Sequence, residues 1–312
     1  MQMYYYWIVY ERIKKLRLFS IFVKKNLFMV YDCFIFFNEL DLLEIRLNEL
    51  DDVVDKFVLV EADKTFQYKP KPFIFEENKE RFSKFLHKII HIKLTEYPLF
   101  IPIINPFSPW KIEFFQRNSI VKGLTNCNPD DIIIISDVDE IPKAQVIKQK
   151  LSEGITKIYG LKMDMFMYFL NNRLIFDAES KMNKEESKDG IWHCTALLPY
   201  KLLKKKPFKI RKTIMRTKRR GEVYEIIPNA GWHFTYIGGV KKIIQKIEAF
   251  SHTEYNLEEY KSEKNIIELI QSGKDLFGRD LEFEIAGNNY QFPQYLETEE
   301  ARKKFNEYFF TK

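Results

Sequence analysis

Cysteine is scarce in this 312-residue chain, and the few cysteines form no pattern. Cys33, Cys127 and Cys194 lie far apart, with no C-x-x-C pair among them. An odd and widely spaced set argues against a disulfide framework and against a structural zinc site. We therefore expect a reducing compartment, and the cytoplasm fits best.

Long apolar runs are also missing. Residues 1–9 are aromatic and apolar, but charged residues follow at once, and a bilayer-spanning helix needs about 20 apolar residues. The order of charges also differs from that of a signal peptide. Residues 1–28 then have two interpretations, a basic amphipathic segment lying peripherally on the inner membrane face or an extension before a start at Met29. We favour the extension and predict one domain over residues 29–312, because the regular α/β pattern begins at Val30.

Signatures of nucleic-acid binding are absent as well. The net charge is +6, and the positive charge is concentrated at residues 12–25 and 201–220. Neither cluster carries zinc-finger spacing or an RNA-binding motif, so no nucleic-acid partner is predicted. The cluster at 201–220 is interpreted as solvated surface.

The first half of the chain alternates apolar strands with helices, which predicts an α/β protein. Parallel strands that are covered on both faces have continuous apolar runs of this kind, so we expect a central, mostly parallel mixed sheet covered by helices. Strands are predicted over residues 30–37, 56–61, 88–92, 131–136, 158–169, 191–198 and 232–236. Helices are predicted over residues 40–50, 82–86, 110–124, 240–250 and 257–271, with Asn38 capping the first and Pro142 opening a further one.

The most apolar strand, residues 131–136, runs directly into Asp137-Val138-Asp139-Glu140. Ligands of open α/β sheets bind where strands end at their carboxyl edge. Three neighbouring carboxylates repel each other unless a cation is present, and a hard divalent ion such as Mn²⁺ or Mg²⁺ prefers such oxygen ligands. The same ion would bridge the two phosphates of a sugar nucleotide and neutralise the leaving diphosphate. The alternative is an ordinary acidic turn at the end of a strand.

An ordered set of motifs resembles glycosyltransferase family 17 from about Val30 to Phe277. The motifs are Tyr31-Asp32-Cys33-Phe34, Phe37-Asn38-Glu39, Phe57-Val58-Leu59-Val60-Glu61-Ala62, Thr65-Phe66, Trp110, Glu113, Gln116-Arg117-Asn118, Ser136-Asp137-Val138-Asp139-Glu140-Ile141-Pro142 and Gly231-Trp232-His233-Phe234. The resemblance implies a GT-A-type (nucleotide-diphospho-sugar transferase) fold. It also implies a UDP-sugar donor, with N-acetylglucosamine as the sugar, and inversion at the anomeric carbon. Because the secretory anchor of the animal members has no counterpart here, we expect a cytoplasmic enzyme with a glycan or glycolipid acceptor.

The predicted metal ligands are Asp137, Asp139 and His233. Enzymes with the implied fold often supply a late histidine to the metal, and imidazole suits Mn²⁺. The alternative for His233 is a core histidine held by hydrogen bonds.

Four further residues, with Asp137, are predicted to bind the donor. Asn38 and Glu39 follow the first strand, and Glu61 ends the second strand at the same edge as Asp137. Glu61 has the alternative of a capping or salt-bridging role. The guanidinium of Arg117 would bind phosphate or lock Asp137, and both roles stay open.

An inverting transfer needs a carboxylate as general base, and the sequence does not single one out. Asp164 and Glu248 are the predicted candidates, with Glu222 and Glu225 also considered.

Two other functions are alternatives to the transferase. One is a non-catalytic nucleotide- or glycan-binding protein on the same fold, which would be expected to lose the acidic cluster. The other is a nucleotidyltransferase. The nucleotidyltransferase would want a Gly-rich or basic phosphate loop after the first strand, which Phe37-Asn38-Glu39 does not supply.

Overall fold

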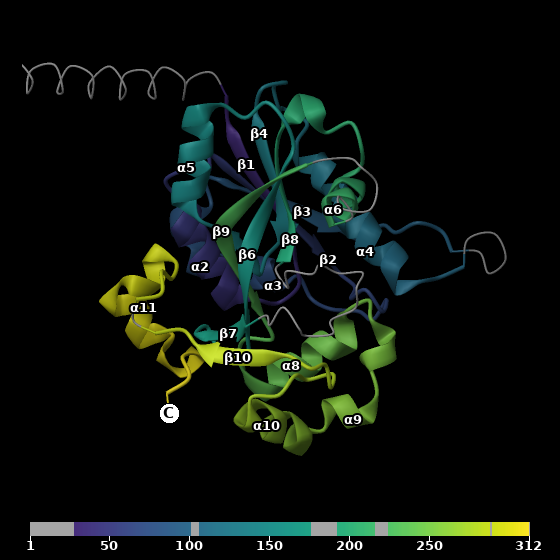
Figure 1. Cartoon of the computed structure of the whole chain (residues 1–312). Coiled ribbons are helices and arrows are strands. Elements are labelled where there is room, and N and C mark those ends of the chain that lie inside the picture. Colours follow the sequence, from purple (N-terminus) through teal and green to yellow (C-terminus); the bar gives the residue numbers. More distant parts are fainter. Residues whose placement is uncertain (1–27, 101–105, 176–191, 216–223, 288, 312) are drawn as a thin grey trace, which may run out of the picture.

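The computed structural model describes residues 28–100, 106–175, 192–215, 224–287 and 289–311 (Figure 1). The predictions made for residues 1–27, for the basic residues 218–220 and for Glu222 lie outside these ranges. In the described ranges, no helix combines the length and the apolarity that crossing a bilayer requires.

Ten strands of the described residues form one mixed sheet in the order β10-β7-β6-β8-β4-β1-β2-β3, with β9 paired to β6 and β5 paired to β9. Their bounds are β1 Val30–Phe36, β2 Lys56–Ala62, β3 Ile89–Leu94, β4 Ile132–Asp137, β5 Glu140–Pro142, β6 Tyr159–Met167, β7 Asn172–Ile175, β8 Trp192–Pro199, β9 Glu225–Thr235 and β10 Glu282–Ile285. The α/β class with a mixed central sheet is confirmed. The parallel strands β3, β2, β1 and β4 form its first half, whereas β8, β7 and β10 join antiparallel to their neighbours.

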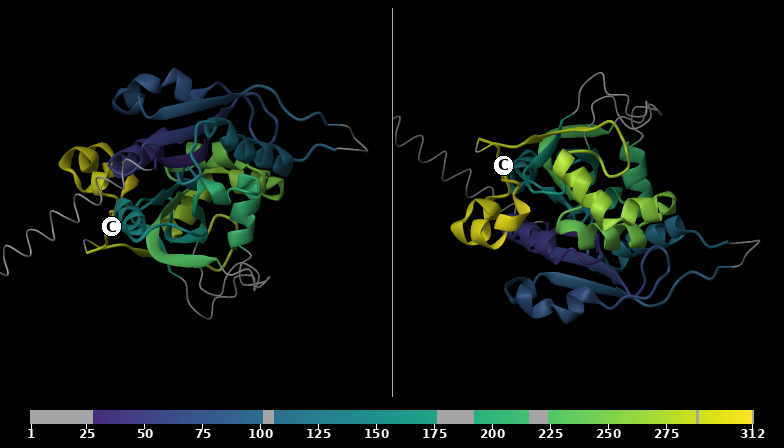
Figure 2. Two further views of the ribbon diagram at one scale, coloured as in Figure 1. Left: turned by 90° about the horizontal axis from the view of Figure 1, so that it is seen from above. Right: turned by 90° about the horizontal axis from the view of Figure 1, so that it is seen from below.

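Helices cover both faces of the parallel half (Figures 1 and 2). On β1, Phe34 and Phe36 pack in one core with residues of α2 and α5, whereas Cys33 and Ile35 pack in the opposite core with residues of α6. Coverage on both faces explains the continuous apolar runs of these strands. The helix bounds are α2 Leu40–Leu50, α3 Ile74–Glu77, α4 Pro109–Asn118, α5 Ala144–Glu153, α6 Pro207–Met215, α8 Gly239–Ala249, α9 Glu258–Lys261, α10 Glu263–Ser272 and α11 Glu299–Lys304. The described residues also form short 3-10 helices, which are, in chain order, η1 Lys79–Phe85, η2 Ser119–Gly123, η3 Tyr200–Leu202, η4 Thr253–Tyr255, η5 Gln294–Glu297 and η6 Asn306–Tyr308.

The strand order reverses between β1 and β4. From β1 the chain moves outward through β2 to β3, and then returns to place β4 on the other side of β1. The two carboxyl ends lie side by side, since Ile35 is in register with Asp137. Ligands of open α/β sheets bind in the crevice that such a reversal leaves. The fold therefore positions a site at the ends of β1 and β4.

The structure corrects several local predictions. The N-cap of α2 is Glu39 rather than Asn38, and the Glu39 side chain does not cap the first N–H groups of the helix. Pro142 belongs to β5, and α5 begins at Ala144. The single helix predicted at 110–124 is α4 followed by the 3-10 helix η2. Strands β7 and β10, and most of the length of β9, were not predicted, because their exposed ends lack an apolar run.

Candidate active site

The acidic turn, Asp137 to Glu140, connects the end of β4 to the start of β5. Arg46 of α2, whose side chain is completely buried, forms hydrogen bonds with the backbone of this turn. The Arg46 guanidinium donates to the carbonyl oxygens of Asp137 at 2.9 Å and Glu140 at 2.6 Å. It also forms a salt bridge with buried Asp32 of β1, with 2.6 Å between Nη2 and Oδ1. Because Arg46 satisfies carbonyl groups that face the protein interior, the turn keeps one conformation.

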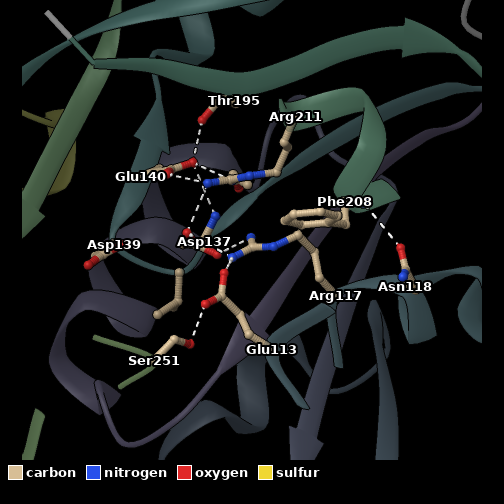
Figure 3. A network of polar contacts seen from close by, with 12 residues as sticks. Glu113, Arg117, Asn118, Asp137, Asp139, Glu140, Thr195, Phe208, Arg211 and Ser251 are labelled. Carbon is tan, nitrogen blue, oxygen red and sulfur yellow. Dashed lines mark hydrogen bonds and ion pairs between the residues drawn. The ribbon is translucent and has the colours of Figure 1, made fainter. Parts of the chain in front are cut away.

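Two arginines bind the carboxylate of Asp137 (Figure 3). Arg117 of α4 donates to both Asp137 oxygens, and Arg211 of α6 donates to Oδ2 at 2.9 Å. Burial acts to raise the pKa of the Asp137 carboxyl, but Arg117 and Arg211 outweigh it and hold that pKa below its usual value. The Asp137 side chain is still 26% exposed, so it remains accessible to a ligand. This contact corresponds to the locking alternative for Arg117, and the phosphate-binding alternative stays a prediction.

Glu140 is fully buried and is the main partner of Arg211. The two guanidinium nitrogens of Arg211 donate to the two Glu140 oxygens, each at 2.7 Å, in the bidentate geometry that suits arginine and carboxylate. Thr195 of β8 donates to the same carboxylate at 2.7 Å. Glu140 therefore anchors the turn to α6 and to β8.

Asp139 points away from the two arginines, as Figure 3 shows. Its Oδ2 lies 2.8 Å from the Lys246 ammonium of α8 and 3.7 Å from Nε2 of His233 in β9. Burial acts to raise the pKa of Asp139, but Lys246 and then His233 lower it well below its usual value. Asp139 and His233 are thus neighbours despite their separation in sequence, because β5 pairs with β9 and sets Glu140 opposite His233.

Side-chain cations already neutralise the acidic turn. Asp137, Asp139 and Glu140 are each paired with Arg117, Arg211 or Lys246. The sequence argument assigned this neutralisation to a metal ion alone. Within the ranges that the structure describes, no group of three or more His, Cys, Asp or Glu side chains is arranged to hold a metal. Asp139 and His233 make a pair of neighbouring donors, and the metal-ligand roles stay predictions.

A surface hollow adjoins this pair, which we call the α2–α8 hollow. It is lined by Asn38, Glu39, Tyr236, Gly238, Lys242 and Lys246, among others. Helix α8 is fastened to the end of β1 on this side, since Lys242 donates to the Asn38 carbonyl at 3.2 Å and Asn38 donates to Gln245 at 3.0 Å. The Glu39 carboxylate accepts from the Asn38 backbone N–H at 2.9 Å. Asn38 and Glu39 therefore lie at the hollow, and their role in donor binding stays a prediction.

Glu61 is enclosed rather than presented to a ligand. Its carboxylate has no exposed surface and accepts from the Phe75 backbone N–H at 3.0 Å. It also contacts Nε2 of His91 at 3.0 Å and the Lys71 ammonium at 3.4 Å. These contacts correspond to the capping and salt-bridging alternative for Glu61.

The two predicted general bases do not face the Asp139–His233 pair. Asp164 of β6 is in register with Trp232 of β9, and side chains alternate along a strand, so Asp164 and His233 point to opposite faces. The Asp164 carboxylate accepts from the Tyr290 hydroxyl at 2.5 Å. Glu248 lies two residues beyond Lys246 on α8, which turns it to the other side of that helix, and it pairs with Lys261 at 3.5 Å.

Sequence reasoning missed Arg46, Arg211 and Lys246. The basic cluster at 201–220 was interpreted as solvated surface, and this is wrong for Arg211, which is 6% exposed. A signal was present, because Arg211 follows Ile210 and precedes Ile214, two buried residues on one face of α6. A charged residue beside such a face is a candidate for a buried pair.

Comparisons with known proteins agree with the resemblance. The model of glycosyltransferase family 17 matches residues 3–184, more than half of the chain. Human beta-1,4-mannosyl-glycoprotein 4-beta-N-acetylglucosaminyltransferase is 34% identical over 134 residues, which are 42% of this chain and 25% of the human protein. The mouse protein of the same name is 33% identical over the same shares. The match therefore spans a quarter of the length of these relatives.

Solved structures show only a distant likeness. Glucosyl-3-phosphoglycerate synthase from Mycobacterium tuberculosis, solved with Mn²⁺, UDP and phosphoglyceric acid, is 11% identical with a TM-score of 0.38, and the match covers 89% of this chain and 94% of that one. HddC from Yersinia pseudotuberculosis is 12% identical with a TM-score of 0.36, and the match covers 65% and 90%. Structural similarity at this level does not indicate which ligands this chain binds.

The family match contains β1 to β4 and the whole acidic turn, whereas β9 and α8 lie beyond it. The sheet, with its acidic turn at the reversal of strand order, has the predicted GT-A-type fold. On the strength of the family match, this chain belongs to glycosyltransferase family 17.

Proposed function

We propose that this protein is an inverting, metal-dependent glycosyltransferase that moves a sugar from a UDP-sugar to a glycan or glycolipid acceptor. One observation carries the proposal: a rigidly held acidic turn lies at the carboxyl end of β4, where the strand order reverses and where α/β proteins bind nucleotides. Family membership supports sugar transfer as the reaction.

Asp139 and His233 would hold the metal ion. A carboxylate oxygen suits Mn²⁺ or Mg²⁺, whereas an imidazole nitrogen beside it, 3.7 Å from Asp139 Oδ2, favours Mn²⁺ over Mg²⁺. Such ions commonly use only one or two protein side chains and take their remaining ligands from water and substrate phosphates. When bound, the metal supplies charge neutralisation for the leaving diphosphate.

Asp137 has a different part in the proposal. Both of its oxygens are engaged by Arg117 and Arg211, yet the carboxylate is partly exposed at the rim of the site. A carboxylate held this way is fixed in position to accept hydrogen bonds from the donor. The proposal therefore gives the residues different roles. Asp137 would position the donor, and Asp139 and His233 would bind the metal ion.

N-acetylglucosamine is the proposed sugar, since the relatives are named N-acetylglucosaminyltransferases. Their names also specify a mannosyl-glycoprotein. Because only a quarter of their length is matched, the acceptor proposed here is no narrower than a glycan or glycolipid. A cytoplasmic location is part of the same proposal, and contact of residues 1–28 with a membrane surface stays the alternative to the favoured interpretation of these residues as an extension.

The test is release of UDP from a panel of UDP-sugars, with and without a mixed glycan acceptor. We expect turnover with Mn²⁺ or Mg²⁺ and its loss in EDTA. Asp139→Ala should lower turnover by roughly a hundredfold or more, a loss typical of removing charge stabilisation at a reacting centre. His233→Ala should weaken Mn²⁺ binding by about tenfold or more, as loss of a ligand contact does.

Asp130→Ala is the matched control, because Asp130 is an exposed aspartate paired only at the surface with Lys201. It should retain full activity. Full turnover in EDTA would contradict metal dependence. Binding of UDP-sugars without turnover under any condition would favour the non-catalytic binding protein, and incorporation of a nucleotide rather than a sugar would favour a nucleotidyltransferase.

A further inference from the structure

Lys246 is hydrogen-bonded to Asp139 Oδ2, the oxygen proposed to bind the metal. Its ammonium lies 2.8 Å from Asp139 Oδ2, and Nε2 of His233 lies 3.7 Å from the same atom. A lysine ammonium and a divalent cation repel each other, so the two cannot both interact strongly with the same buried carboxylate oxygen. Under the proposed function, metal binding must therefore weaken or break the Lys246–Asp139 pair.

The structure also shows where the displaced ammonium would go. The Lys246 side chain is 25% exposed, whereas that of Asp139 is 9% exposed. Lys246 lines the α2–α8 hollow beside Lys242 and Gly238. The lysine stem is flexible, and a small rotation would carry the charge from the acidic turn into that hollow. Glu39 and Asp41 also line the hollow, so a phosphate anion bound there would compete with these two carboxylates for the ammonium.

Around Lys246, further groups favour a charged side chain that stays charged. The Thr235 hydroxyl oxygen lies 3.4 Å from its ammonium, and the Tyr236 ring centroid lies 5.3 Å away. The ammonium therefore has a hydroxyl oxygen and an aromatic ring near it, besides Asp139, in the conformation that the structure shows.

We propose that Lys246 is an exchangeable cation of the donor site. In the resting protein it pairs with Asp139, and with a divalent cation held by Asp139 it would pair instead with the diphosphate of the donor. This inference rests on the proposed function and adds a donor-binding residue to it. Because binding effects are reciprocal, metal and donor would each strengthen the binding of the other through this one side chain.

The experiment measures Mn²⁺ binding by electron paramagnetic resonance, first alone and then with UDP, in the full chain and in Lys246→Met. Without UDP, Lys246→Met should bind Mn²⁺ about tenfold more tightly than the unaltered protein, since it has lost the competing cation and coupling of this kind is typically 5- to 150-fold. With saturating Mn²⁺, the same variant should bind UDP about tenfold more weakly. Opposite signs for the two ligands distinguish exchange from a purely structural role.

Lys241→Met is the matched control, because Lys241 is an exposed lysine of the same helix. It should change both affinities by less than about twofold, which corrects for loss of a charge alone. Lys246→Gln is the second variant, to be used if Lys246→Met unfolds, because the amide can still donate to Asp139. It should show the same two signs with smaller changes.

The outcomes separate this inference from the function on which it rests. If the unaltered protein binds Mn²⁺ with UDP, but neither Lys246 variant binds Mn²⁺ alone more tightly, the exchange is wrong and the metal site stands. If none of the proteins binds Mn²⁺ with or without UDP, the metal-dependent function fails and the exchange fails with it.

Discussion

Arg211 is the residue on which the geometry of the acidic turn depends most. It joins Glu140 by two hydrogen bonds and Asp137 by one, and its side chain is 7% exposed. We predict that Arg211→Met lowers the free energy of unfolding by about 3–5 kcal/mol, because it removes one partner of a buried ion pair. Urea unfolding followed by circular dichroism measures the loss.

Arg173→Met is the comparison for Arg211. Arg173 also pairs with a glutamate, Glu284, but that pair is at the surface, with side chains 35% and 42% exposed. Exposed pairs contribute roughly 0–1 kcal/mol, so this variant should be nearly as stable as the unaltered protein. Equal losses for the two variants would show that burial of the Arg211 pair is not what stabilises the turn.

The pairing of β5 with β9 is the element that brings His233 to Asp139. Gly231 makes this pairing possible, because an added Cβ would lie 2.4 Å from the Ile141 carbonyl oxygen and 3.0 Å from Pro142 Cα. Both atoms belong to the backbone of β5, which cannot shift easily because it is paired with β9. We predict that Gly231→Ala destabilises the protein by about 1–3 kcal/mol, the usual cost of overpacking, and also weakens Mn²⁺ binding by shifting His233.

Gly287→Ala is the control for this element, since an added Cβ there meets nothing within 4 Å. It should change neither the melting temperature nor the Mn²⁺ affinity measurably. Unchanged Mn²⁺ binding in Gly231→Ala, with the expected loss of stability, would show that the β5–β9 approach does not position His233.

At the scale of the whole molecule, the C-terminal segment closes one of the cores. Figure 2 shows α11 beside α2, at opposite ends of the sequence. Phe292, Leu296 and Phe305 are buried in a core shared with residues of α2 and β9. Each large apolar side chain buried on folding contributes about 1.5–3 kcal/mol, so these three contribute roughly 5–9 kcal/mol, which is comparable to the net stability of a typical protein.

We therefore predict that deleting residues 292–312 lowers the melting temperature by at least about 10 °C or prevents folding, measured by differential scanning calorimetry. Deleting residues 1–27 is the matched comparison. The regular α/β pattern of the sequence begins at Val30, so this deletion should leave the melting temperature nearly unchanged. If the N-terminal deletion proves the more damaging, residues 1–27 contribute to the domain and the predicted boundary at residue 29 is wrong.

The sequence alone determined the parallel half of the sheet and the location of the acidic turn. Strands β1, β2, β3 and β4 were predictable because burial on both faces requires continuous apolar runs, and a run is a local property. Asp137 and Asp139 follow the most apolar of these runs directly, so their place at the sheet edge needed no tertiary information. The family motifs added the fold type, since each of them is also a short, local stretch of sequence.

Only the tertiary structure decided what the acidic turn contacts. Arg211 is 71 residues from Glu140, and Lys246 is 107 residues from Asp139. A buried cation and a solvated one look alike in a sequence, because the difference lies in which carboxylate the folded chain places beside it. The direction of the Asp164 and Glu248 side chains was undecidable for a related reason: strand register and helix docking set it, and both depend on packing between distant segments.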